Sequence, residues 1–233
     1  MNSNMTFPAP LSALALVGML ALLMLSLILS IGFALARKRK ALKATAAIAL
    51  IAVAGYCAAV LVFSVASETV VLRSGEEKYF CEIDCHLAYS VVSAGYEPDP
   101  QVAGDTRFVV QLETRFDPTT ISRHRGNGPL TPSPREVVMV DGAGHVYRPA
   151  EIQGRSLLTP LRPGEAYRTR LIFEVQAMAA HPLLWLHTKA DAPEWMMIGN
   201  ELSPLHRKVF FQLSFLPEQP GIGSSPPAIP GSF

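Results

Sequence analysis

The sequence predicts a two-helix hairpin of membrane-spanning length, followed by an all-β domain with the form of an antiparallel sandwich. Three observations carry this fold class. Residues 1–67 contain no acidic residue and split into two long apolar runs around a basic cluster. The rest of the chain repeatedly alternates apolar and polar side chains with a period of two, which is typical of half-buried strands. Pro and Gly separate these alternating segments at the short intervals expected of a sandwich.

The hairpin consists of two apolar runs, residues 11–36 and 44–67, joined by the basic loop 37–43. Each run exceeds the roughly 20 apolar residues that cross the hydrocarbon core of a bilayer. A short loop rich in Lys and Arg is retained on the cytoplasmic side. We therefore expect a two-pass protein of the cell membrane, with the N-terminal leader 1–10 and everything after residue 67 outside the cytoplasm.

A cleaved signal peptide is the alternative interpretation of these runs. The leader 1–10 lacks the basic n-region of a secretory signal, and the first run is longer than a typical h-region. The second run has a basic leader and ends in the small residues Val65, Ala66 and Ser67. If a signal peptide is cleaved from this chain, cleavage after the second run is therefore the conceivable case.

Charge also divides the chain into two parts. The basic residues of the loop 37–43 are all the charge in residues 1–67, and the remainder holds all 19 acidic residues. Because the whole chain is +1 and its first part is +5, the remainder carries about −4, with its Arg residues dispersed among acidic neighbours. We therefore expect no nucleic-acid partner. The expected partners are the lipid bilayer and a membrane or envelope protein.

The first predicted strand runs from Tyr79 to Val91. Its odd positions are mostly apolar or aromatic and include both cysteines of this region. Its even positions include the polar residues Glu82, Asp84, His86 and Ser90. In a straight strand this alternation puts the odd positions in the core and the even positions in solvent.

Further strands follow the same pattern within an expected domain of residues 72–216. Three alternating segments and one apolar run predict strands, and a turn of sequence Asp-Gly-Ala-Gly predicts a hairpin in which glycines supply positive φ. The alternating segments are 108–116, 167–175 and 209–215, the apolar run is 183–188, and the hairpin strands are 136–140 and 145–148. The tail 217–233 is rich in Pro, Gly and Ser and is expected to be disordered.

Two long loops lie between these strands. The loop 118–135 contains several prolines and a basic stretch, so it is either a binding loop or a flexible insertion. The flexible insertion is favoured, because this composition is common in unstructured loops. The loop 190–208 contains Trp195, Met196 and Met197, which are placed to cap one end of the core.

The sequence Cys81-Glu-Ile-Asp-Cys85-His86 is the one constellation that offers chemistry, and it has four interpretations. On a straight strand the two sulfurs lie too far apart to bond, at roughly 13 Å, and behave as buried apolar groups. A disulfide across a bulge or turn is favoured by an oxidising compartment. The third interpretation is a metal site, and the fourth is covalent haem, because the motif is one residue longer than the usual attachment sequence. No other cysteine outside the membrane offers a partner, since Cys57 lies in the second span.

The metal interpretation rests on ligand chemistry. Cys81, Cys85 and His86 offer thiolate and imidazole ligands that suit copper. A fourth ligand would have to come from a distant part of the chain, such as His206, Met196 or Met197. Copper is therefore the alternative cofactor, whereas the main interpretation has none.

The layout resembles that of cytochrome oxidase subunit II, which has an outside amino terminus, a two-helix hairpin and an outer β domain with a binuclear copper centre. In that family the paired cysteines lie near the end of the β domain and are followed by a His and a Met. Here Cys81 and Cys85 lie at the start of the domain, and Tyr89 stands where the following His would be. The copper motif does not match, so the resemblance covers the layout and one short spacing.

A second resemblance concerns the outer domain. Leu161-Arg-Pro-Gly-Glu165, followed by the apolar strand 166–175, resembles the turn and strand of small immunoglobulin-like extracytoplasmic domains of bacterial envelope proteins. This resemblance implies an immunoglobulin-like sandwich that acts as a binding or scaffolding module. It implies no catalytic residue.

Enzyme motifs are lacking in the sequence. It contains no Gly-x-Ser-x-Gly elbow, no His-Glu-x-x-His and no phosphate-binding glycine loop, and its six histidines are scattered. We therefore expect a membrane-anchored extracytoplasmic binding or assembly module without catalytic activity. The alternative is a copper or redox accessory protein that uses Cys81, Cys85 and His86.

Overall fold

The computed structural model describes residues 2–81, 85–98, 106–120, 126–175, 181–189 and 194–213. Their contacts divide the chain into two compact units, each of which takes in segments that are far apart in the sequence. The β unit is Met1–Asn4, Thr69–Lys189 and Lys208–Phe233, and the helical unit is Met5–Glu68 and Ala190–Arg207. Each unit is described by itself below.

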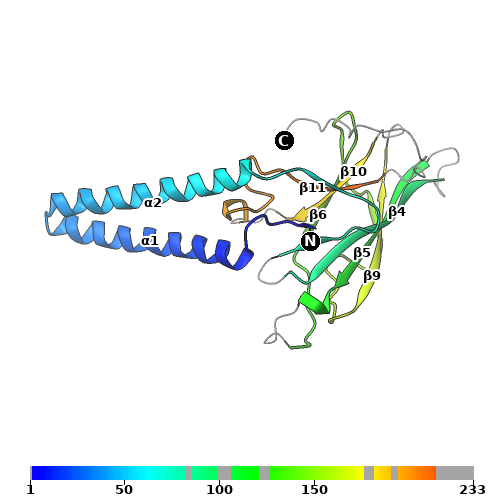
Figure 1. Cartoon of the computed structure of the whole chain (residues 1–233), viewed down its shortest axis with the longest axis horizontal. Helices are drawn as coiled ribbons and strands as arrows, with labels where there is room; N and C mark the ends of the chain where they lie inside the picture. The colour runs from blue at the N-terminus through cyan, green and yellow to red at the C-terminus, as the bar shows by residue number, and fades with distance from the viewer. Residues whose placement is uncertain are drawn as a thin grey trace. The chain divides into compact units, whose positions relative to one another are not determined.

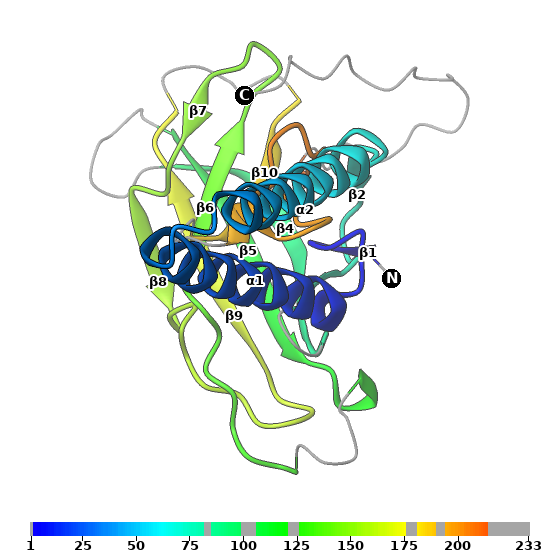
Figure 2. The same ribbon diagram turned by 90° about the vertical axis from the view of Figure 1, so that its left-hand side faces the viewer.

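Two long apolar helices, α1 (Ala9–Leu35) and α2 (Arg39–Val65), form most of the helical unit. They lie side by side in both views (Figures 1 and 2). Each has 27 residues, and at ~1.5 Å per residue each is about 40 Å long, which exceeds the ~30 Å hydrocarbon core of a bilayer. Their mean hydropathies reach 2.7 and 2.5, and most of their apolar side chains are exposed. Both helices are therefore long and apolar enough to cross a membrane.

The β unit contains two sheets. The first has six strands in the order β1-β3-β4-β5-β9-β8, and the second has five in the order β2-β11-β10-β6-β7. The strands of the first sheet are β1 Asn2–Ser3, β3 Lys78–Phe80, β4 Leu87–Pro98, β5 Thr106–Phe116, β8 Glu151–Gly154 and β9 Ala166–Phe173. Those of the second are β2 Val70–Leu72, β6 Arg135–Val140, β7 Val146–Tyr147, β10 Leu183–Thr188 and β11 Val209–Gln212.

The inner faces of the two sheets share one apolar core, which makes the domain sandwich-like (Figure 1). The predicted alternation of the central strands is confirmed, because the side chains assigned to the inner face of β5 and β9 are buried. They are Phe108, Val110, Leu112, Thr114 and Phe116 on β5, and Tyr167, Thr169, Leu171 and Phe173 on β9. The second sheet contributes Met139, Leu184, Leu186 and Phe211, each fully buried.

The prediction of a purely antiparallel sandwich is wrong, because both sheets are mixed. β1 pairs with β3 in parallel, and β2 pairs with β11 in parallel. Both strands are very short and lie next to the apolar helices in the sequence, before α1 and after α2. A strand of two or three residues is too short to show a periodic pattern. Its pairing depends on tertiary contacts, which cannot be predicted from the alternation of apolar and polar residues. The two strands also lie partly outside the range 72–216.

A single strand over 79–91 is wrong as well. The chain forms two antiparallel strands, β3 and β4, in which Phe80 is paired with Leu87. The buried face changes parity between them: Lys78 and Phe80 are buried on β3, whereas Leu87, Tyr89 and Val91 are buried on β4. Tyr79 therefore leaves the core. Glu82 and Asp84, expected on the solvent side, lie outside the described residues.

The predicted hairpin around Asp141 is confirmed. β6 and β7 are antiparallel neighbours, with Met139 opposite Tyr147. Gly144 has a φ of +86°, a backbone region that glycine enters without steric cost. In the loop 118–135, Pro118–Thr120 form a 3-10 turn, and 121–125 lie outside the described residues, as does the tail 217–233.

Candidate functional site

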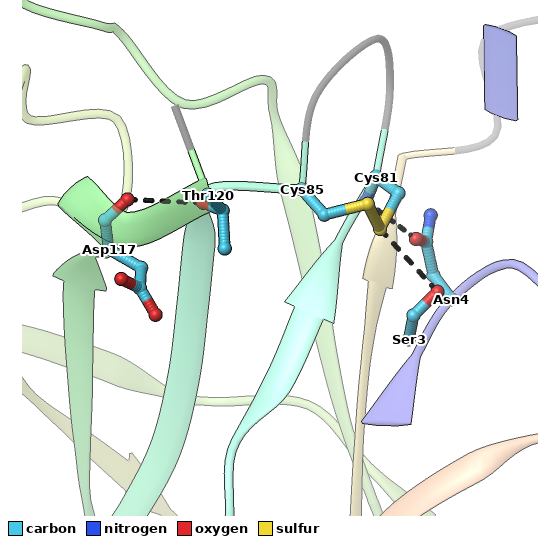
Figure 3. Close-up of a disulfide and its surroundings, with 6 residues drawn as sticks. All are labelled: Ser3, Asn4, Cys81, Cys85, Asp117 and Thr120. Atoms are coloured by element: carbon cyan, nitrogen blue, oxygen red, sulfur yellow. Dashed lines mark hydrogen bonds between the residues drawn. A yellow bond between two sulfur atoms is a disulfide. The ribbon is translucent and has the colours of Figure 1, made fainter. Parts of the chain in front are cut away.

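The Cys81 and Cys85 sulfurs form a disulfide, with an S–S distance of 2.03 Å and a Cα–Cα distance of 4.1 Å (Figure 3). Cys81 directly follows β3, and Cys85 precedes β4 by one residue, His86. The bond therefore joins the two ends of the connection that reverses the chain. A straight strand through both cysteines is not formed, which removes the geometry that would have kept the two sulfurs apart.

The first residues of the chain pack against this disulfide. The Cys81 backbone N–H donates to Asn4 Oδ1 at 2.8 Å, and the Asn4 N–H donates to the Tyr79 carbonyl at 3.1 Å. Ser3 Oγ lies 3.6 Å from Cys81 Sγ (Figure 3). Asn4 is 3% exposed. β1 and Asn4 thus extend the first sheet at β3 and cover one side of the disulfide.

His86 follows Cys85 but is part of the packing of the domain. Its side chain is buried and stacks on the Phe116 ring at a centroid distance of 4.9 Å. Its backbone carbonyl accepts the Asp117 N–H at 2.8 Å. These contacts place the imidazole against the end of β5.

The three residues considered as distant metal ligands, His206, Met196 and Met197, belong to the helical unit. There His206 Nδ1 lies 2.6 Å from the Arg207 carbonyl and donates to it, and Nε2 lies 3.1 Å from Thr6 Oγ1. Burial lowers the pKa of His206. Within the described part of the chain, no three His, Cys, Asp or Glu side chains are grouped to hold a metal ion.

Beside the disulfide, on the outward side of β3, four polar side chains form a connected network. Arg115 donates to Glu77 through Nε at 2.7 Å and Nη2 at 2.8 Å, a bidentate pair. Its Nη2 also lies 3.1 Å from Asp117 Oδ2. The Tyr79 hydroxyl lies 2.8 Å from both Glu77 Oε2 and Asp117 Oδ2. The network ties β3 to the end of β5.

Asp117 is the member of this network with the most hydrogen-bond donors to its side chain. Its Oδ1 accepts the Thr119 hydroxyl at 2.7 Å and the Thr119 N–H at 2.9 Å, and Thr120 Oγ1 donates to its carbonyl (Figure 3). The Thr119 hydroxyl, then the Thr119 N–H, Tyr79 and Arg115, hold the pKa of Asp117 well below its usual value, although burial opposes this shift. Asp117 is therefore a charged carboxylate at neutral pH.

The pKa values of Glu77, Arg115 and Tyr79 shift in the directions that their hydrogen bonds and ion pairs with one another favour. The Arg115 hydrogen bonds lower the pKa of Glu77, and the same pair raises the pKa of Arg115. Burial, followed by hydrogen bonds to Glu77 and Asp117, raises the pKa of Tyr79. Each charged group is stabilised by another member, so the network supplies no acid or base poised near neutral pH.

This network was not predicted, because Tyr79 was assigned to the core. The signal that would have revealed it is the two-residue spacing of Glu77 and Tyr79 at β3, and of Arg115 and Asp117 at the end of β5. Residues two apart share one face of a sheet, and here the two polar pairs meet across β4, which lies between β3 and β5.

Lys78 occupies the inward position that Tyr79 was expected to fill. Its side chain is fully buried, and Nζ donates to the Leu186 carbonyl at 2.6 Å and to the Val209 carbonyl at 3.3 Å. It also lies 5.1 Å from the centre of the Phe80 ring. Hydrogen bonds of this kind are what allow a buried cation to persist in a core. The lysine joins the first sheet to the backbone of the second.

A small hollow lies elsewhere on the first sheet, lined by Glu97, Arg107, Gln153 and Arg170 among others. Arg170 is paired with Glu97, and Arg107 Nη1 lies 3.8 Å from Glu151. Its charged side chains are thus engaged with one another across the strands.

No family model matches the chain, and no curated protein matches it. Among solved structures, a secreted protein of Mycobacterium tuberculosis, MPT63, is similar with 11% identity and a TM-score of 0.36. That similarity covers 63% of this chain and 99% of the other.

Proposed function

We propose that this chain is a membrane-anchored extracytoplasmic binding or assembly module of the cell envelope, without catalytic activity. α1 and α2 are its anchor, the basic loop 37–43 lies in the cytoplasm, and the β unit lies outside. The observation that carries the proposal is the state of the candidate site. The sulfurs of Cys81 and Cys85 are bonded to each other, and the charged side chains of Glu77, Arg115 and Asp117 are bonded within one network. The candidate site therefore stabilises the fold, and binding is left to the outer surface of the β unit.

Two features support the location. A stretch of basic residues between two apolar helices favours a cytoplasmic loop. A disulfide persists in oxidising compartments and is rare in the cytosol, so Cys81–Cys85 favours a β unit outside the cytoplasm.

The β unit is further proposed to belong to the immunoglobulin-like class. Two packed sheets of short strands, joined by turns such as 161–165, support this assignment. Gly164 in that turn has a φ of +84°, and Glu165 accepts the Arg162 N–H through its side chain at 2.8 Å. Such domains commonly present binding loops at the ends of their sheets.

The proposal is tested on the full-length chain, because β1 and β2 are parts of the sheets. The protein is extracted from native membranes in mild detergent, and free thiols and bound copper are counted. We expect one free thiol, that of Cys57, and no stoichiometric copper. Copper that is retained by the parent protein and lost from Cys81→Ser would overturn the proposal in favour of the copper or redox alternative.

Binding is tested in the same membranes by photo-cross-linking. A photoreactive residue is placed at exposed positions of the β unit, Thr131 and Gln153, and at Lys40 in the basic loop as the matched control. The proposal predicts a discrete adduct with another envelope protein from at least one β position and not from Lys40. Adducts from Lys40 alone would contradict it.

A further inference from the structure

The segment Glu194–Arg207 is a part of the chain whose location the sequence did not indicate. Its Trp195 and Met196 were expected at one end of the β core, but the segment belongs to the helical unit. It begins with the 3-10 turn Glu194–Met196 and continues in turns up to Leu205. In Figure 1 it is the orange segment beside α2.

The segment runs along the C-terminal part of α2. The Tyr56 hydroxyl donates to the Met196 carbonyl at 2.9 Å, and the Arg207 N–H donates to Ser67 Oγ at 2.8 Å. Tyr56 lies nine residues before Val65, the end of α2. At ~1.5 Å per residue this is about 13 Å along the helix axis. The segment therefore reaches some distance down the helix.

The same segment contacts the residues that lead into α1. The Thr6 N–H donates to the Gly199 carbonyl at 2.8 Å, and Met5 forms a bridge with Asn200. Gly199 has a φ of +74°, and a Cβ there would lie 2.7 Å from the Phe7 Cβ. Only glycine fits this approach. The segment is thus held by the entrance of α1 and by α2 together.

The position of Tyr56 fixes the depth of the segment in a membrane. α2 has 27 residues, and an untilted crossing of the hydrocarbon core requires about 20. If all the surplus length lay outside the cell, the outer boundary would fall about two residues beyond Tyr56, and any other placement puts Tyr56 deeper. The Met196 carbonyl is therefore at the depth of the acyl chains or at their boundary.

Part of the backbone of the segment is hydrogen-bonded in the way that this depth requires, because hydrocarbon offers no hydrogen bonds. Each of four carbonyls accepts a bond from within the helical unit. The Glu194 carbonyl accepts from Met197 N–H at 3.0 Å, that of Met196 from Tyr56, that of Met197 from Ser203 Oγ at 2.7 Å, and that of Asn200 from Ser203 N–H at 2.9 Å. An ordinary surface loop can leave such groups to water.

Several polar side chains of the segment are buried, and two of its large apolar ones are exposed. Glu201 is 2% exposed and Asn200 is 3% exposed, whereas Trp195 is 46% and Leu205 is 63% exposed. The C-terminal end of α2 also has exposed apolar side chains, among them Val62 and Val65. Trp is enriched at the boundary between acyl chains and headgroups.

From these contacts we propose that Glu194–Arg207 is a re-entrant loop that binds the outer leaflet of the bilayer, with Trp195 and Leu205 inserted among the lipids. The occupant of this apolar surface is phospholipid, because the segment is hydrogen-bonded to α2 and to the residues that lead into α1. Both helices are of membrane-spanning length, and the segment lies at their depth. The inference rests on the proposed membrane anchor and adds a third contact between the chain and the bilayer.

The two tryptophans of the chain provide the test. The full-length Trp185→Phe variant retains only Trp195, and the matched Trp195→Phe variant retains only Trp185, on β10 in the β unit. Both are reconstituted in phosphatidylcholine–phosphatidylglycerol vesicles with bromines at defined acyl carbons. We expect loss of fluorescence in the variant that retains Trp195, strongest with bromines near the headgroup, and no loss in its partner. Equal fluorescence with and without bromine would overturn the proposal.

A second readout does not depend on tryptophan. Leu205→Cys in a Cys57→Ser background is labelled with a nitroxide. We expect the relaxation of the nitroxide to respond more to oxygen, which dissolves in the acyl chains, than to a water-soluble nickel complex. The reverse order contradicts insertion.

Flotation of the same vesicles separates the loop proposal from the anchor proposal. Protein that floats without quenching overturns the loop proposal and leaves the anchor standing, whereas protein that does not float overturns both.

Discussion

At the scale of single residues, Asp117 illustrates how the candidate site maintains the fold. It accepts hydrogen bonds from Thr119, Tyr79 and Arg115 and is 7% exposed. A carboxylate bonded in this way is more acidic in the folded state than in the unfolded state. Folding is therefore coupled to the charge of this group.

This coupling predicts how stability depends on pH. Because the folded pKa of Asp117 is lowered, its contribution is present above the unfolded value of about 4 and is lost as the pH falls below it. Asp117→Asn should lower the free energy of unfolding by about 1–3 kcal/mol at pH 7 and flatten its fall below pH 4. Urea unfolding in detergent across this pH range measures both. The matched control Glu174→Gln alters an exposed carboxylate, and an effect of equal size there would contradict the assignment.

Residue-scale pattern explains what could and could not be predicted at the candidate site. A disulfide between Cys81 and Cys85 was one of four interpretations, and the spacing alone did not choose between it and two separate thiols. Tyr79 was assigned to the core because the alternation of buried and exposed positions was continued through a turn that was not recognised. On the far side of such a turn, the odd and even positions exchange faces. Lys78 takes the inward position. Apolar–polar alternation could not predict this, because it assigns only apolar residues to the core.

At the scale of elements, the short strand β1 is what joins the start of the chain to the β unit. It pairs with β3 in parallel, and Asn4 beyond it bonds to Tyr79 and Cys81. Two strand residues alone would hold little, so the buried Asn4 side chain contributes much of the attachment.

Asn4→Ala should therefore destabilise the β unit. It removes the acceptor of the Cys81 N–H and leaves that buried donor unpaired, which costs about 1–3 kcal/mol. Thermal unfolding of the full chain in detergent would show the lower midpoint, together with faster amide exchange at Cys81. The matched control is Asn2→Ala in the same strand, where a small change is expected. Equal midpoints for the two variants would argue against this role of Asn4.

The longer elements were predictable and the short ones were not. β5, β9 and the β6–β7 hairpin followed from alternation over many residues and from the turn at Asp141. The edge strands β1 and β2 contain too few residues for a pattern, and their parallel direction is set by partners distant in sequence. The segment Glu194–Arg207 was expected at one end of the β core and belongs to the helical unit, because Trp and Met pack equally well on a β core and on apolar helices.

At the scale of the whole molecule, two chemically distinct parts alternate along one chain. β1 precedes α1, β2 follows α2, and the segment Glu194–Arg207 belongs again to the helical unit. The chain therefore passes between the two parts several times.

The proposed orientation of the chain puts the basic loop 37–43 in the cytoplasm and the β unit outside it. It is tested most directly by labelling intact cells with a membrane-impermeant maleimide. The variants are Lys40→Cys and Thr131→Cys, each in a Cys57→Ser background, because the disulfide-bonded Cys81 and Cys85 do not react. We expect Thr131→Cys to be labelled in intact cells and Lys40→Cys to be labelled only after permeabilisation. Labelling of Lys40→Cys in intact cells, with Thr131→Cys protected, would contradict it.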